Sequence, residues 1–239
     1  MKNADMTQNA YSMQVIARIA TDFPSKFGIP RQSGLVPEAV GEIRFEPKFR
    51  DPSAVRELEQ FSHLWLLWVF SEFVREGETW SPTVRPPRLG GNRRVGVFAT
   101  RSPNRPNPIG LSCVRLLGTE NTEQYGTVIR VAGADLMDGT PILDIKPYLP
   151  FADAHPEASG GFAEAARGHS LRVVLPRELD EILPAQKRDV MLRLLEQDPR
   201  PSYHHDPSRV YGFPFAGYEV RFTVDGDVLS VCEIVRLGN

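Results

Sequence analysis

Residues 85–110 constrain the fold most, because their prolines and glycines exclude a helix over this stretch. Arginines stand at positions 85, 88, 93, 94, 101 and 105, and no acidic residue occurs between Glu78 and Glu120. Soluble surfaces usually mix both signs of charge, so a long stretch of one sign indicates an anionic partner. Such a loop can present guanidinium and backbone N–H groups to phosphates or carboxylates. The alternative is a rim of solvated arginines around a β-structure.

The composition is that of an ordinary globular protein, with 41% hydrophobic and 24% charged residues among 239. The net charge is −2, so any contact with nucleic acid must come from a local basic patch. The two cysteines, Cys113 and Cys232, argue against a disulfide scaffold and a thiolate metal site. The first ten residues carry no apolar signal segment, and the apolar run 64–70 is too short to span a membrane. We expect a soluble, cytoplasmic protein.

Short strands separated by Pro and Gly dominate the first 150 residues. Asp51 followed by Pro52 predicts an N-cap and a short helix through Gln60. The run 64–70 lacks alternation, which predicts a strand covered on both faces. The pattern favours a sandwich or barrel. The predicted strands cover residues 11–20, 42–46, 64–70, 95–99, 111–117, 126–131 and 140–146.

The pattern changes after about residue 170, where a strand at 171–175 precedes an amphipathic helix at 184–197. Residues 218–235 predict a hairpin that turns at Asp225-Gly226. The sequence therefore predicts a mostly β chain: a β-barrel over 1–155, a linker over 156–170 and a small α+β domain over 171–239. The apolar face of the helix is predicted to consist of Val190, Met191, Leu194 and Leu195.

Several familiar catalytic and cofactor motifs are missing from the sequence. No Gly-x-Gly-x-x-Gly follows a predicted strand and no Walker motif occurs, which argues against a doubly wound nucleotide-binding sheet. The histidines lack metal-ligand spacing, so we expect no metal. The absence of Gly-x-Ser-x-Gly argues against a nucleophile-elbow hydrolase.

Residues 133–150 place three carboxylates and one lysine in a strand–turn–strand context. Asp138-Gly139 is typical of a hairpin turn, and Asp144 and Lys146 share one strand face, where they can form a simple ion pair. Combined with the arginine loop, these acids suggest a site that holds a cationic cofactor beside an anionic substrate.

The two segments together resemble the TsaA/TrmO-like family, the S-adenosylmethionine-dependent tRNA methyltransferases that act on N6-threonylcarbamoyladenosine. The resemblance implies a non-Rossmann β-barrel catalytic domain, a homodimer, and a cofactor near the dimer interface. The matching motifs are Pro30-Arg-Gln32, Phe61-Ser-His-Leu-Trp65, Arg85-Pro-Pro-Arg-Leu-Gly-Gly-Asn92, Val97-Phe-Ala-Thr-Arg-Ser102, Arg105-Pro-Asn-Pro-Ile-Gly110, Asp135-Leu-Met-Asp-Gly-Thr140, Asp144-Ile-Lys-Pro-Tyr148 and Gln197-Asp-Pro-Arg-Pro-Ser-Tyr203.

The resemblance also implies roles for individual residues. The cofactor contacts it implies are Arg31, Gln32, Gly34, Leu35, Ser71, Glu72, Arg101, Leu111, Ala132, Gly133, Ala134 and Asp135. The substrate or RNA contacts we expect are Arg85, Arg88, Arg93, Arg94 and Asn107. Asp138 is the first candidate for the base, with Lys146 and Arg105 as electrostatic partners.

The chemistry of this reaction suits the charged residues. A carboxylate such as Asp135 or Glu72 would favour the sulfonium cation of S-adenosylmethionine. Arg93, Arg94 or Arg105 could bind the threonyl carboxylate of the substrate, and the remaining arginines the phosphates of the tRNA anticodon loop.

Three alternatives remain open. The first is a non-catalytic RNA-binding β-barrel module, which would need no cofactor pocket. The second is a methyltransferase of the same fold with another substrate. The third, a hydrolase that uses Asp135 and Asp138 as a carboxylate pair, lacks a general acid in an apolar pocket.

Overall fold

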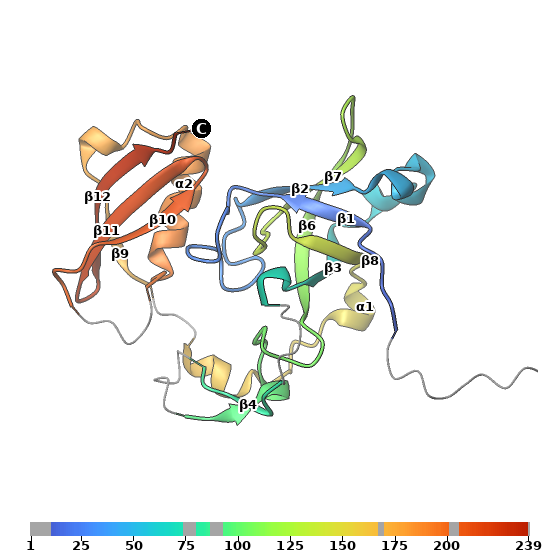
Figure 1. The fold of residues 1–239 in the computed structure, drawn as a ribbon, viewed down its shortest axis with the longest axis horizontal. Coiled ribbons are helices and arrows are strands. Elements are labelled where there is room, and N and C mark those ends of the chain that lie inside the picture. Colours follow the sequence, from blue (N-terminus) through green and yellow to red (C-terminus); the bar gives the residue numbers. More distant parts are fainter. Residues whose placement is uncertain (1–10, 74–79, 87–92, 167–169, 201–205, 239) are drawn as a thin grey trace, which may run out of the picture.

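The computed structural model describes residues 11–73, 80–86, 93–166, 170–200 and 206–238. Six antiparallel strands form a closed barrel in the order β1-β2-β7-β6-β3-β8 (Figure 1). Pairing of Ala17 with Ile142 closes the ring between β1 and β8. The prediction of a mostly β chain with a barrel is confirmed. The barrel strands are β1 (Ala17–Ala20), β2 (Val40–Phe45), β3 (His63–Val69), β6 (Ile109–Thr122), β7 (Gly126–Ala132) and β8 (Pro141–Pro147).

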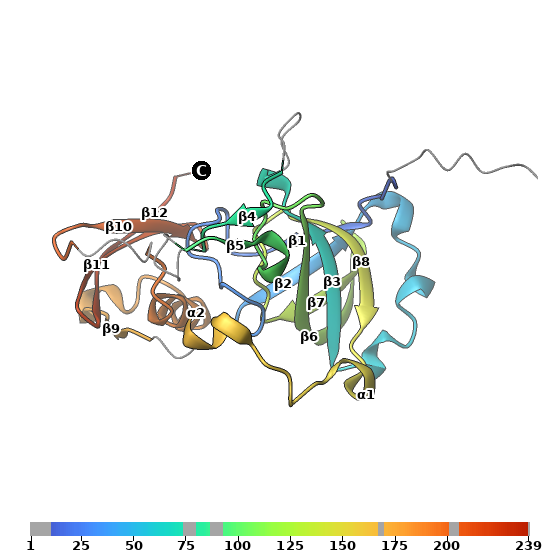
Figure 2. The ribbon, with the colours of Figure 1, turned by 90° about the horizontal axis from the view of Figure 1, so that it is seen from below.

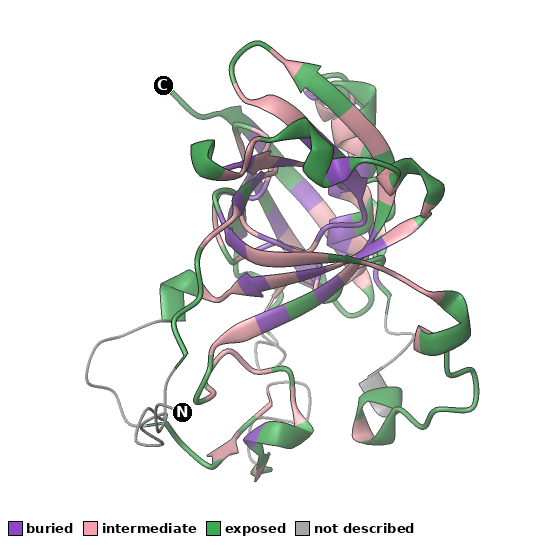
Figure 3. Cartoon of the chain, turned by 90° about the vertical axis from the view of Figure 1, so that its right-hand side faces the viewer, coloured by how far each residue is buried: buried purple, intermediate pink, exposed green. Residues whose placement is uncertain are grey.

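The interior of the barrel follows from the alternation of side chains along its strands (Figure 3). In β3, Leu64, Leu66 and Trp68 are buried, whereas the intervening residues are half-buried. The prediction that residues 64–70 are covered on both faces is only partly right, because one face of the strand points into the barrel core and the other is half-buried. The strand itself is confirmed.

A second unit consists of a four-stranded sheet, β10-β11-β12-β9, with helix α2 (Ala185–Glu196) packed against it. The predicted apolar face of α2 and the hairpin that turns at Asp225-Gly226 are both confirmed, since Val190, Met191, Leu194 and Leu195 are buried. Gly226 takes φ +56° in this turn. The strands are β9 (Arg172–Val174), β10 (Tyr211–Phe215), β11 (Tyr218–Asp225) and β12 (Val228–Arg236).

Short 3₁₀ turns replace the helix that the sequence predicts after Asp51. Asp51 does cap the first turn, accepting a hydrogen bond from the Ser53 N–H at 2.9 Å. Glu57 then takes a left-handed conformation with φ +66°, which ends any continuous helix through Gln60. The two turns are η2 (Pro52–Val55) and η3 (Leu58–Gln60).

A short two-stranded ribbon leaves the barrel between β3 and β6 (Figures 1 and 2). Thr83 and Val84 of β4 (Thr83–Val84) pair with Gly96 and Val95 of β5 (Val95–Gly96). The predicted strand over 95–99 is only partly right, because Val97–Ala99 form a 3₁₀ turn, η6. The remaining short elements are η1 (Pro47–Phe49), η4 (Ser71–Phe73), α1 (Pro150–Asp153), η7 (Gly161–Ala166) and η8 (Arg177–Leu179).

Within the described ranges no helix is both long and apolar enough to cross a membrane.

Candidate functional site

A cavity of about 590 Å³ opens on the barrel beside the C-terminal unit. Its walls come from the loop after β1, the end of β3, the proline-rich loop before β6, the start of β6 and the segment after β7, with Pro199 contributed from beyond α2. A volume in this range is typical of small-molecule sites, which combine apolar walls with a few polar groups. The walls include the polar residues Arg31, Gln32, Arg101, Arg105, Asn107 and Asp135, and the apolar residues Phe27, Trp68, Phe70 and Leu111.

Asp135 is the carboxylate that the described residues contribute to the cavity wall. Its Oδ1 accepts a hydrogen bond from the Ser112 hydroxyl at 2.6 Å, and Ser112 in turn accepts one from the Trp68 indole N–H at 3.0 Å. Ser112 is 1% exposed. A buried hydroxyl with both a donor and an acceptor partner fixes the position of the carboxylate.

Two opposing effects act on the pKa of Asp135. Burial raises the pKa above its ordinary value, because it penalises the charged form. The hydrogen bond from Ser112 and the nearby positive charge of Arg101 act against this rise. The carboxyl is thus poised to gain stabilisation from a further cation in the cavity.

Arg101 and Gln32 meet across the cavity, since the guanidinium of Arg101 donates to the Gln32 side-chain oxygen. Arg105 is tied to the same loop through a bond from Nη1 to the Thr100 carbonyl at 3.2 Å. The proline-rich loop therefore supplies one wall of the cavity. A side-chain oxygen and a backbone carbonyl hold the guanidinium groups of Arg101 and Arg105 in place.

The loop after β1 is held against the segment after β7 by a close backbone approach. The Gly34 N–H donates to the Gly133 carbonyl at 2.9 Å, and a Cβ on Gly133 would lie 3.2 Å from the backbone of Gly34. Gly133 also takes φ +77°, a conformation that favours glycine. These two glycines bring Arg31 and Gln32 alongside Asp135.

The structure brings together five of the twelve predicted cofactor residues on the cavity wall. They are Arg31, Gln32, Arg101, Leu111 and Asp135. Gly34, Ala132, Gly133 and Ala134 adjoin the wall in sequence and position its loops. Leu35 and Ser71 are exposed, and Glu72 pairs with Lys26 at 3.9 Å.

The predicted substrate residues divide between the cavity and the ribbon. Arg105 and Asn107 line the cavity. Arg85, Arg93 and Arg94 are exposed on the β4–β5 ribbon. Arg88 lies outside the described residues.

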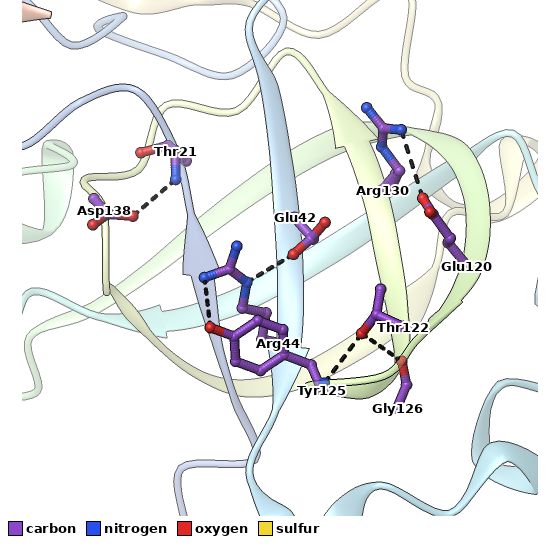
Figure 4. A network of polar contacts seen from close by, with 9 residues as sticks. All are labelled: Thr21, Glu42, Arg44, Glu120, Thr122, Tyr125, Gly126, Arg130 and Asp138. Atoms are coloured by element: carbon purple, nitrogen blue, oxygen red, sulfur yellow. Dashed lines mark hydrogen bonds and ion pairs between the residues drawn. The ribbon is translucent and has the colours of Figure 1, made fainter. Parts of the chain in front are cut away.

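Asp138 does not line the cavity. Its carboxylate accepts a hydrogen bond from the Thr21 N–H at 3.0 Å and so links the β7–β8 connection to the end of β1 (Figure 4). The turn at Asp138-Gly139 exists, with φ +75° at Gly139, but the predicted hairpin is wrong because β7 and β8 are not neighbours in the barrel. Lys146 pairs with Asp144 at 2.7 Å, as the simple ion-pair interpretation predicts.

Sequence reasoning missed the residues that support Asp135. Gly110 and Ser112 occupy buried positions of β6, and Trp68 comes from the facing strand β3. A serine on the inward face of a barrel strand, in register with buried apolar positions, is the signal that could have identified Ser112. Among the described residues no group of three or more His, Cys, Asp or Glu is arranged to hold a metal ion.

Comparison with known proteins places this architecture in a family. Residues 18–154 match the tRNA-methyltransferase O N-terminal domain and residues 169–237 match the TrmO C-terminal domain. The tRNA (adenine(37)-N6)-methyltransferase of Escherichia coli is 42% identical over 224 residues, covering 90% of this chain and 94% of that protein.

Two further relatives come from Pseudomonas aeruginosa. A putative S-adenosylmethionine-dependent methyltransferase, RcsF, is 41% identical over 84% of this chain and 87% of its own length. A crystal structure of TrmO superposes with a TM-score of 0.77 and 34% identity, covering 97% of this chain and 100% of that one. The matches cover both the barrel and the C-terminal sheet, and the chain belongs to the tRNA-methyltransferase O family.

Proposed function

We propose that this chain transfers a methyl group from S-adenosylmethionine to N6 of N6-threonylcarbamoyladenosine at position 37 of tRNA. The observation that carries the proposal is the half-buried carboxylate of Asp135 on the wall of a cavity whose other polar side chains include arginines and amides. The names of the relatives, which include tRNA (adenine(37)-N6)-methyltransferases, support the tRNA and adenine part of the proposal. The arginines on the cavity wall support the threonylcarbamoyl part of the proposal, because they could bind its carboxylate.

The donor set of the cavity suits S-adenosylmethionine. Asp135 places a negative charge where a sulfonium cation would be stabilised in surroundings of low polarity. Trp68, Phe70 and Leu111 offer apolar surface, while Gln32 and Arg101 offer hydrogen-bonding groups. When bound, the cofactor supplies an electrophilic methyl group, whose bond to sulfur breaks with the electron pair left on sulfur as the acceptor nitrogen bonds to carbon.

The protein's own contribution is positioning and charge. Holding the acceptor nitrogen in line with the methyl group converts an encounter into an oriented reaction, which can supply much of the rate. The acceptor nitrogen is urea-like, so its proton must leave to a base or its developing charge must be stabilised. Arg105 and Asn107 line the cavity and are proposed to orient the substrate, with Arg105 facing its threonyl carboxylate.

Two carboxylates are candidates for the base. Asp138 is the candidate that the sequence favours, and in this chain it accepts a hydrogen bond from the Thr21 N–H and does not line the cavity. Asp135 lies on the wall, and burial raises the pKa of its carboxyl toward the range useful for proton transfer. Single-turnover methyl transfer by Asp138→Asn at saturating cofactor separates the two candidates, because the rate falls if Asp138 is the base and stays at the wild-type value if Asp135 is.

Two expected partners extend the proposal. The exposed arginines of the ribbon, Arg85, Arg93 and Arg94, would bind anticodon-loop phosphates, with affinity that falls steeply as salt rises. A homodimer, implied by the family resemblance, would bring a second copy close to the cavity. Analytical ultracentrifugation of the purified protein tests the dimer directly.

The experiment that tests the function is calorimetric titration with S-adenosylmethionine, followed by methyl transfer to tRNA with and without the threonylcarbamoyl group. Wild type should bind, and Arg101→Ala should bind at least tenfold more weakly, because Arg101 holds Gln32 and faces Asp135. Arg56→Ala, an exposed arginine beyond η2, is the matched control. Absence of binding with and without tRNA would favour the non-catalytic RNA-binding module.

A further inference from the structure

The β4–β5 ribbon carries an exposed pair of aromatic rings, Trp80 and Phe98. Their ring centroids lie 6.0 Å apart with planes inclined by 34°. Trp80 is 51% exposed and Phe98 is 72% exposed. Among the ring pairs of the described residues it is the one in which both members are exposed. Exposed apolar surface that is grouped rather than scattered is typical of an interaction site.

Backbone hydrogen bonds of the ribbon hold the segments that carry the two rings. Thr83 pairs with Gly96 and Val84 with Val95, and the Val97 N–H donates to the Pro82 carbonyl at 3.0 Å. Val97, next to Phe98, is 1% exposed and anchors the turn. Because the scaffold is fixed before binding, little conformational entropy is lost when a flat ligand stacks on the rings.

The charge around the rings favours a nucleic acid. Arg85, Arg93 and Arg94 are exposed on the same ribbon, and Arg94 Nη1 bonds to Thr83 Oγ1 at 3.1 Å. The sequence contains no carboxylate from residue 79 to residue 119, so this stretch of the chain supplies no acidic partner to these arginines. Aromatic faces interleaved with arginines are the arrangement that binds single-stranded RNA, through base stacking and phosphate contacts.

The ribbon also leads directly into the cavity. Phe98 lies in η6, and the next residues of the chain include Thr100 and Arg101, both on the cavity wall. A base stacked on the ribbon would therefore neighbour a nucleotide that enters the cavity.

We infer that Trp80 and Phe98 form a stacking platform for an unpaired nucleobase of the RNA substrate, next to the adenosine that is methylated. The inference rests on the proposed function for the identity of the RNA. The arginines hold the phosphates on either side of the stacked base. Stacking does not depend on base identity, so the platform contributes affinity and position rather than sequence preference.

The test measures binding of a fluorescently labelled synthetic anticodon stem–loop RNA to the full chain by anisotropy. Trp80→Ala and Phe98→Ala should each weaken binding about tenfold, the effect typical of losing one stacked base. Phe151→Ala is the matched control, because Phe151 is 89% exposed but lies in α1, away from the ribbon in both views (Figures 1 and 2). Cofactor binding to each variant should equal that of wild type.

A second ligand separates stacking from charge. The same RNA with abasic sugars in the loop keeps its phosphates, so wild type and the two variants should bind it equally weakly. A platform variant that binds the complete RNA as wild type does would overturn the inference. So would an equal loss for the complete and abasic RNAs.

Two further results would separate the platform from a subunit interface and from the proposed function. Sedimentation of Trp80→Ala and Phe98→Ala as smaller species than wild type would assign the rings to an interface between copies, which overturns the platform. Wild type that binds RNA through the platform but neither binds S-adenosylmethionine nor transfers methyl groups would refute the proposed function and leave the platform standing.

Discussion

At the residue scale, the carboxylate of Asp135 joins the stability of the barrel to its chemistry. Burial raises the pKa of this group, so the folded state holds the proton more tightly than the unfolded chain does. The protonated carboxyl therefore contributes stability to the folded state. This contribution is complete below the ordinary pKa of 3.8 and is lost as the pH rises through the folded-state pKa. At neutral pH the ionised carboxylate therefore lowers stability, a cost often found at binding sites.

Asp135→Asn should remove this cost. We expect the variant to unfold at a higher temperature than wild type at pH 7, to lose the advantage at low pH, and to lose binding of S-adenosylmethionine. Thermal unfolding across a pH series measures the first two effects and calorimetry the third. Asp225→Asn, at the exposed β11–β12 turn, is the control. A variant no more stable than wild type at pH 7 would contradict the account.

Ser112 positions the carboxylate of Asp135 through its hydroxyl. Ser112→Ala removes the donor to Asp135 and leaves the Trp68 N–H without its acceptor, which should cost about 1–3 kcal/mol of stability in chemical denaturation. The hydrogen bond from Ser112 lowers the pKa of Asp135, so its loss raises that pKa further. Cofactor binding should consequently fail at a higher pH on acidification than in wild type. An unchanged pH profile would limit Ser112 to packing.

At the element scale, the antiparallel strands β3 and β6 pair so that Gly110 lies opposite Trp68. A Cβ on Gly110 would lie 2.2 Å from the Trp68 ring, so the ring, which lines the cavity, must move. Gly110→Ala should destabilise the protein by about 1–3 kcal/mol, the usual cost of overpacking, and weaken cofactor binding. Denaturation and calorimetry measure the two effects.

Gly96→Ala is the matched control for that change. Gly96 has an ordinary φ of −59°, and a Cβ there would meet nothing within 4 Å. It should retain the stability and the cofactor affinity of wild type. Equal behaviour of the two alanine variants would show that the Trp68 ring yields without affecting the cavity.

How far the elements follow from sequence depends on how local their causes are. Short apolar runs separated by Pro and Gly located the barrel strands, and apolar spacing located α2, because both patterns are local to one element. The break at Glu57 and the arrangement of β7 and β8 were missed, since a single left-handed residue and the order of strands around a barrel are set by contacts distant in sequence.

The residues of the site likewise fall into those that the sequence predicted and those that depend on distant contacts. Arg101, Gln32 and Asp135 were named through family resemblance, and the structure places all three on one cavity. Ser112 and Trp68 were not named, because their hydrogen bonds depend on the register between β3 and β6. The position of Asp138 outside the cavity likewise involves its contact with Thr21 at the end of β1, a residue distant in sequence.

At the scale of the whole molecule, the wall of the cavity depends on both units. Phe23, Val36 and Ala39, from the loop between β1 and β2, belong to the core cluster of the C-terminal sheet. Asp22 forms an ion pair with Lys187 of α2, and its carbonyl accepts from the Ala216 N–H at 3.0 Å. The hydrophobic core of the C-terminal unit thus includes residues from the predicted barrel range 1–155 as well as from the range 171–239. The loop that carries Arg31 and Gln32 is consequently held from the C-terminal side.

Gly28 tests this dependence, because it contacts the C-terminal core and lines the cavity. It takes φ +85°, and a Cβ there would lie 2.3 Å from the buried ring of Phe213. Gly28→Ala should therefore cost about 3 kcal/mol of stability from strain and overpacking, and should weaken cofactor binding by displacing the loop. Denaturation and calorimetry again provide the measurements.

Gly217→Ala separates the packing effect from the backbone effect. Gly217 also has a positive φ, +83°, but a Cβ there would meet nothing within 4 Å. Its variant should lose only about 1–2 kcal/mol, the cost of a left-handed side-chain residue, and bind the cofactor as wild type does. If both variants lost equal stability and kept full cofactor affinity, the C-terminal sheet would not determine the position of the loop. A selective loss in Gly28→Ala would instead make the sheet part of the binding site, because the wall of the cavity would then require the packing of Phe213.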